Sequence, residues 1–190
     1  MIITALYYTI PNQVSSKMQK EIALLAADDA VANVGVTESD KDNHGPAIKK
    51  YLASVDLEEG QAWCGAFLIY RFKSAAEQLG LTLSKDFLKL KGWTPDYKKY
   101  AQKFNIWTSV EEAKANHSLI KKGHIVLFYS SEKERIYHCG IVISSNESGI
   151  VCVEGNSAPG PGVNANGDQV ALKRRSWTHL GKLGGFMRTY

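Results

Sequence analysis

The sequence predicts an α+β protein in which helices come first and an antiparallel sheet follows, and two observations carry this prediction. Over residues 16–118 apolar side chains recur mostly at helical spacing. Over residues 123–190 they give way to short β-branched runs separated by turn-forming residues. No linker interrupts the chain, so we expect one domain over residues 1–190, with a mainly helical part and a sheet part.

Three segments predict the main helices. In residues 16–33, Ser16 precedes Gln19 in a capping-box pattern. A short helix is expected after Pro46, and a third runs over residues 64–79. The third helix has one apolar face, formed by Cys64, Phe67, Leu68, Phe72, Ala75 and Leu79. Residues 84–118 are helical or irregular in our prediction, with a helix most strongly indicated over residues 95–104.

The sheet is expected from five short runs, which lie at residues 123–129, 138–144, 149–155, 169–175 and 183–190. A hairpin should join the second run to the third, which places the ends of these two strands close together. The stretch 157–168, rich in Gly, Pro and Asn, is expected to form a hairpin loop.

Composition limits the function classes. Of 190 residues, 44% are hydrophobic and 22% charged, and the net charge of +4 is too small and too evenly spread to indicate nucleic-acid binding. The first ten residues, MIITALYYTI, have no basic residues before them and no cleavage pattern after them. We therefore expect synthesis in the cytoplasm without a signal peptide, and no membrane span.

The three cysteines, Cys64, Cys139 and Cys152, show neither disulfide nor zinc spacing. Cys139 is expected to face the core, and it could pair with Cys152 only if their strands adjoin, with the reduced state favoured. The stretch QAWCGAF sets Cys64 apart, because a helix N-terminus lowers the pKa of a thiol and its free amides can stabilise an oxyanion. Gly65 would leave room there for a substrate.

A nucleophilic cysteine needs a base, and the base needs an orienting partner. His138 opens a predicted strand and is the leading candidate, with His124 the nearest competitor. The other histidines, His44, His117 and His179, are expected at the surface. Glu154 and Asn156 end the next strand two residues apart, so both should point to the same side and could orient the imidazole.

Four motifs in order, WCGAF, GHIVLF, HCGIVIS and VEGN, resemble the CHAP domain (cysteine, histidine-dependent amidohydrolase/peptidase) of the papain-like superfamily, which includes NlpC-type peptidases. Residues 35–52 also look like the Glu- and Asn-bearing entry segment of related lysins. The resemblance implies a papain-like fold with the nucleophile at a helix start. It implies Cys64 as nucleophile, His138 as base, Glu154 as its orienting residue and Asn156 as an assisting polar residue. Asn43, in the entry segment, is a candidate for substrate binding.

The resemblance further implies hydrolysis of a peptidoglycan amide bond, either between N-acetylmuramic acid and L-alanine or within the stem peptide or cross-bridge. No cofactor is implied. Some members bind calcium, but here Asp40 and Asp42 lie far upstream of the cysteine, and we predict no metal site. Delivery to the wall as a phage lysin or as an injected antibacterial effector fits a chain without a signal peptide. An effector would have an immunity protein and a secretion-system carrier as partners.

Two alternatives remain open at this stage. The chain could be a catalytically silent wall-binding module whose aromatic residues stack on its ligand, or a cysteine hydrolase of an amide outside the wall. Of the candidate aromatics, Trp63 and Tyr137 are expected to line a substrate groove, whereas Trp93, Tyr97 and Trp107 are expected in the core.

Overall fold

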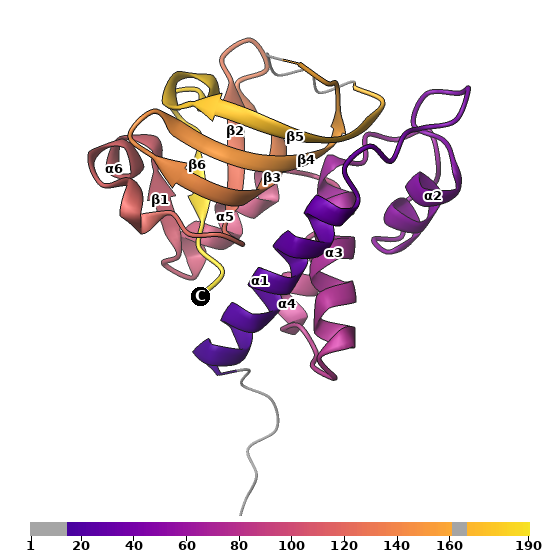
Figure 1. The fold of residues 1–190 in the computed structure, drawn as a ribbon, viewed down its shortest axis with the longest axis horizontal. Helices are drawn as coiled ribbons and strands as arrows, with labels where there is room; N and C mark the ends of the chain where they lie inside the picture. Colours follow the sequence, from indigo (N-terminus) through magenta and orange to yellow (C-terminus); the bar gives the residue numbers. More distant parts are fainter. Residues whose placement is uncertain (1–14, 161–166) are drawn as a thin grey trace, which may run out of the picture.

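The computed structural model describes residues 15–160 and 167–190, and the α+β class is confirmed there (Figure 1). The N-terminal run MIITALYYTI and part of the 157–168 loop lie outside the described residues. The helices are α1 (Ser16–Ala32), α2 (Pro46–Ala53), α3 (Cys64–Gln78), α4 (Lys85–Leu88), α5 (Pro95–Lys103) and α6 (Val110–Ala115), with 3-10 turns η1 (His117–Leu119) and η2 (Trp177–Leu180).

The sheet contains β1 (Trp107–Ser109), β2 (Ile125–Ser130), β3 (Arg135–Asn146), β4 (Gly149–Ser157), β5 (Gln169–Ser176) and β6 (Gly185–Met187). All neighbouring strands are antiparallel and their order is β1-β6-β2-β3-β4-β5. The expected hairpin between β3 and β4 is present, and it places the two strands at the centre of the functional region described below.

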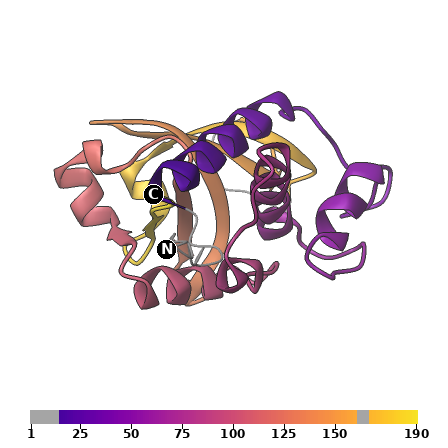
Figure 2. The same ribbon diagram turned by 90° about the horizontal axis from the view of Figure 1, so that it is seen from below.

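The sheet lies between two sets of covering elements, as Figures 1 and 2 show. Helices α1 and α3 pack together and belong to the larger apolar core, in which they meet Leu127, Ile141 and Val153 from the central strands. A smaller core contains Val126, Phe128 and Val142 of the same strands with side chains from α6 and η2. Both faces of the central strands are therefore buried, which explains their nearly continuous apolar sequences.

Three boundaries differ from the sequence prediction. The N-cap of α1 is Ser15, whose side chain accepts a hydrogen bond from the Met18 amide, so the predicted capping box at Ser16 and Gln19 is wrong. Strand β1 lies inside the segment predicted to be mainly helical and pairs with β6 at the sheet edge. Strand β3 begins at Arg135, three residues before His138, because the polar residues after the turn still pair with β2.

Candidate active site

Cys64 is the first residue of α3 and is 5% exposed. Trp63 precedes it as the N-cap and makes no side-chain capping bond, so amides of the first turn remain available to an anion. A hydrogen bond from the Cys139 thiol makes the largest contribution to lowering the Cys64 pKa well below its usual value, and burial opposes it. The His138 side chain and the Gly65 amide lower the pKa further. Cys64 is thus placed to be a thiolate.

His138, from β3, lies between the cysteine and a carboxylate and is fully buried. Its Nε2 is 2.9 Å from Glu154 Oε2, while Nδ1 is buried and has no hydrogen-bond partner among the described residues. The imidazole also interacts with the Cys64 thiol. Burial acts to lower the pKa of His138, but the interactions with Cys64 and Glu154 outweigh it and raise that pKa to about 9. A thiolate and an imidazolium are therefore mutually stabilised.

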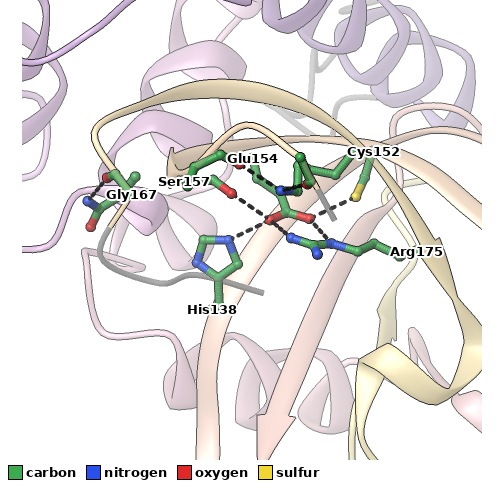
Figure 3. Close-up of polar contacts among 10 residues, drawn as sticks. His138, Cys152, Glu154, Ser157, Gly167 and Arg175 are labelled. Carbon is green, nitrogen blue, oxygen red and sulfur yellow. Dashed lines mark hydrogen bonds and ion pairs between the residues drawn. The ribbon is translucent and has the colours of Figure 1, made fainter. Parts of the chain in front are cut away.

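Glu154, from β4, is the centre of a buried polar cluster (Figure 3). Its carboxylate accepts hydrogen bonds from His138, the Ser157 hydroxyl at 3.2 Å and the Cys152 thiol at 3.2 Å. Burial favours a higher pKa, but His138 and Arg175 lower the pKa of Glu154 to about 2. The carboxylate is consequently ionised at neutral pH and fixes the imidazole by its Nε2.

Arg175, from β5, completes this cluster and was not among the predicted site residues. Its Nε and Nη2 donate to the two Glu154 oxygens at 2.7 and 2.5 Å, and its side chain is fully buried. The sequence places it in a basic run that suggests a solvated surface, yet along β5 the residues Lys173 and Arg175 are buried while Leu172 and Arg174 are exposed. Only the inverted pattern of apolar and charged residues in this strand could have revealed it.

Asn156 lies at the same end of β4 but has other partners than those predicted. Its φ of 54° and the irregular pairing between Glu154 and Ser157 break the alternation of the strand, so the expectation that it points to the same side as Glu154 is wrong. Its Oδ1 accepts a hydrogen bond from the Trp63 amide at 3.1 Å, and its Nδ2 donates to Asn43 Oδ1 at 3.2 Å. Asn156 thus holds Trp63, the residue before Cys64, rather than the imidazole.

Trp63 and Gly65 do not line a groove. Trp63 is fully buried, and its Nε1 donates to Glu38 Oε1 at 2.7 Å. At Gly65 an added Cβ would lie 3.0 Å from the Gly92 carbonyl oxygen and 3.1 Å from the Tyr97 hydroxyl. The space beside Gly65 is therefore filled by protein, so glycine is favoured there by tight packing rather than by substrate entry.

Among the other aromatic candidates, Tyr97 is buried as predicted, but Trp93 is 53% exposed. The Arg135 guanidinium lies 4.5 Å from the Trp93 ring, in the segment that packs against Gly65. Tyr137 is half-buried, with its ring centroid 6.2 Å from that of His138. Trp93 and Tyr137 are thus the aromatic residues near the cysteine and histidine that remain partly accessible.

His124 is separate from this cluster. It is buried against Tyr190, with ring centroids 5.2 Å apart, and its Nδ1 accepts a hydrogen bond from the Lys121 amide. Burial lowers the pKa of His124 to about 4, so it is neutral at physiological pH. Its contacts are structural, and it does not interact with Cys64.

The entry segment forms a surface pocket lined by Asp40, Lys41, Asp42, Asn43, His44, Glu59 and Gly60. Within residues 15–160 and 167–190, no group of three or more His, Cys, Asp or Glu side chains is arranged to hold a metal ion. Asn43 joins this pocket to the site through its contact with Asn156. All three cysteines are free, and Cys139 and Cys152 are fully buried.

The arrangement therefore combines a thiol at a helix start, an imidazole and an ionised carboxylate, each on a core element. In the described part of the chain no helix is both long enough and apolar enough to cross a lipid bilayer. Comparisons of the chain with protein-family models, with curated proteins and with solved structures find no significant match, so the functional assignment depends on the residues and their geometry.

Proposed function

We propose that the protein is a cysteine hydrolase of a papain-like type that cleaves an amide bond of peptidoglycan. The observation that carries the chemistry is the chain of contacts from Cys64 through His138 to Glu154. The wall substrate is supported by the resemblance of the four motifs to CHAP domains. Delivery as a phage lysin or as an injected effector, with an immunity protein as partner in the second case, belongs to the same proposal.

The reaction begins with attack of the Cys64 thiolate on the carbonyl carbon of the amide. The oxyanion that forms is stabilised by amides at the start of α3, where the helix dipole favours negative charge. His138, protonated while it faces the thiolate, gives its proton to the leaving amine. An acyl-enzyme remains, with its carbonyl carbon bonded to the sulfur.

Water then hydrolyses the acyl-enzyme, with the now neutral His138 as general base. Glu154 keeps the ring oriented through Nε2 and stabilises the imidazolium whenever it forms. Because Nε2 is held by Glu154, Nδ1 is the nitrogen that exchanges a proton with the cysteine and the substrate.

The test is digestion of purified peptidoglycan followed by mass spectrometry of the released fragments, which also identifies the bond. We expect Cys64→Ala to reduce turnover by several orders of magnitude, because only binding and oxyanion contributions remain. His124→Gln is the control, because this buried ring packs against Tyr190 and lies outside the cluster. Equal activity of Cys64→Ala and the unaltered protein would disprove the mechanism.

Two further outcomes separate the alternatives. Sedimentation with peptidoglycan without any cleavage would support a silent binding module. Cleavage of defined L-peptides but not of stems that contain D-amino acids would support a hydrolase of another amide. The proposal expects preference for the D-amino-acid stems.

A further inference from the structure

Arg175 places a full positive charge at the far end of the proposed catalytic residues. Its Nε and Nη2 donate to both oxygens of Glu154, at 2.7 and 2.5 Å. Neither side chain is exposed to solvent. In Figure 3 the guanidinium and the His138 ring approach the same carboxylate, so Glu154 is shared between two cations.

A buried ion pair carries a large desolvation penalty, because both charged groups must leave water, so the hydrogen-bonding needs of a carboxylate alone do not explain it. Glu154 already accepts hydrogen bonds from Ser157 and Cys152. If the orienting side chain were a neutral amide, neutral donors of this kind would be enough to hold it in place. Arg175 adds charge and a rigid two-bonded geometry that these donors cannot give. The result is an alternation of charge from the Cys64 thiolate to the His138 imidazolium, the Glu154 carboxylate and the Arg175 guanidinium.

We propose that Arg175 is a positioning residue of the hydrolase: it holds Glu154 ionised and in one orientation, and through it sets the pH range in which the Cys64–His138 ion pair exists. This inference rests on the proposed function for its meaning in catalysis. Its electrostatic part concerns the thiol and the imidazole alone and can be measured without a substrate.

The sign of the effect follows from the groups around the cluster. The titratable and charged side chains that face it are Cys64 from α3, Tyr137, His138 and Cys139 from β3, Cys152 and Glu154 from β4, and Lys173 and Arg175 from β5. The Lys173 ammonium donates to the Ala158 and Gly160 carbonyls and not to Glu154. Loss of the Arg175 charge disfavours every anion and favours every cation nearby, so all these groups hold their protons to higher pH.

The experiment compares Arg175→Met, which removes the charge, with Arg175→Lys, which keeps it but cannot form the two-bonded pair. Arg174→Met is the matched control, because Arg174 is the exposed neighbour in the same strand. The Cys64 thiolate is titrated by its ultraviolet absorbance, as the difference from the Cys64→Ser form of each protein. Circular dichroism establishes that each variant is folded.

We expect the thiolate titration of Arg175→Met to move upward by about one pH unit, less than a direct contact would give because two groups intervene. Arg174→Met should titrate as the unaltered protein does. In Arg175→Lys the Cys64 thiolate should titrate at the same pH as in the unaltered protein. This variant should nevertheless turn over peptidoglycan about tenfold more slowly at unchanged KM, since the imidazole is no longer held as rigidly.

An unshifted titration in folded Arg175→Met, or an equal shift in Arg174→Met, overturns the electrostatic role. Unaltered kcat in Arg175→Lys overturns the positioning role, and this variant decides the matter if Arg175→Met does not fold. The unaltered protein could show a low thiolate pKa, and Arg175→Met the upward shift, while no peptidoglycan is cleaved. In that case the inference about Arg175 stands and the proposed wall substrate is wrong.

Discussion

The side-chain oxygen of Asn156 accepts a hydrogen bond from the backbone N–H of Trp63 at 3.1 Å, although 93 positions separate the two residues. This bond ties the end of β4 to the residue immediately before Cys64. The same asparagine donates to Asn43, Glu38 and the Gly167 carbonyl, so it joins the entry segment, α3 and the start of β5. Its φ of 54° is one that asparagine tolerates better than most residues.

Asn156→Gly should lower kcat by about tenfold to a hundredfold, because glycine accepts the positive φ but leaves the Trp63 amide without its acceptor and the nucleophile less well placed. Turnover of peptidoglycan fragments measures the loss. Asn43→Gly is the control, because it removes one Nδ2 partner at another positive-φ position and leaves the Trp63 contact in place. A glycine variant with unchanged kcat would show that this bond does not position Cys64.

Gly65→Ala should destabilise the fold by about 1–3 kcal/mol, since the new methyl group crowds the Gly92 carbonyl and the Tyr97 hydroxyl. Thermal unfolding measures this change. Tyr97→Phe removes one of the two obstacles, so the double variant should be less destabilised than the sum of the two single changes. Simple additivity would mean that the hydroxyl is not what excludes a side chain at position 65.

Cys139→Val should raise the pKa of Cys64, because valine has nearly the shape of cysteine but cannot donate to the thiolate. The rate of Cys64 alkylation by iodoacetamide as a function of pH measures this pKa, and the alkylated residue is identified by mass spectrometry. We expect the rate to rise at higher pH than in the unaltered protein. An unchanged pH profile would show that His138 and the helix start are sufficient to hold the thiolate.

His124→Gln should make the protein less sensitive to acid. In the folded protein the pKa of His124 is about 4, against 6.5 for an unperturbed histidine, so between these values the unfolded chain binds a proton that the folded chain does not. Stability therefore falls as pH drops from 6.5 toward 4, by up to about 3 kcal/mol. Unfolding temperature measured across this window should change less in His124→Gln.

The same substitution at exposed His179 is the control for His124. If His124→Gln loses stability with falling pH as the unaltered protein does, groups other than His124 cause the loss of stability above pH 4.

Glu154 affects stability at lower pH. Its pKa of about 2 in the folded protein, against 4.5 when unperturbed, contributes stability above pH 4.5 that is lost as the pH falls through 2.

Most helices and strands were predictable from their apolar periodicity, as in α3, whose start at Cys64 is where the sequence placed it. The short edge strand β1 was not. Residue type and position at the helix start and the strand ends singled out Cys64, His138 and Glu154, which the structure places in one cluster; their catalytic roles stay a prediction. The β3–β4 pairing, which the short hairpin made foreseeable, brings His138 and Glu154 together. Packing of α3 against these two strands, which no local pattern encodes, adds Cys64.

Arg175, Trp63 and Trp93 show where sequence reasoning stops. Arg175 is buried because β5 pairs with β4 in a register that sets Arg175 opposite Ile150, on the same side of β4 as Glu154, and no local pattern encodes this register. Trp63 is buried because Glu38 and Asn156, both far away along the chain, satisfy its polar groups. Trp93 is exposed because its neighbours Gly92 and Thr94, rather than its ring, make the contacts with α3 and β3.

Gly155 lets β4 and α3 pack so closely that they should unfold together. A side chain there would come within 2.7 Å of Phe67 and 2.8 Å of Trp63, so the backbone of β4 rests directly against the first turns of α3. Two elements in such contact cannot open separately without exposing the core that they share. Amide hydrogens around Cys64 and Glu154 should accordingly exchange only through global unfolding, which makes the nucleophile, the imidazole and the carboxylate one cooperative unit that is lost all at once.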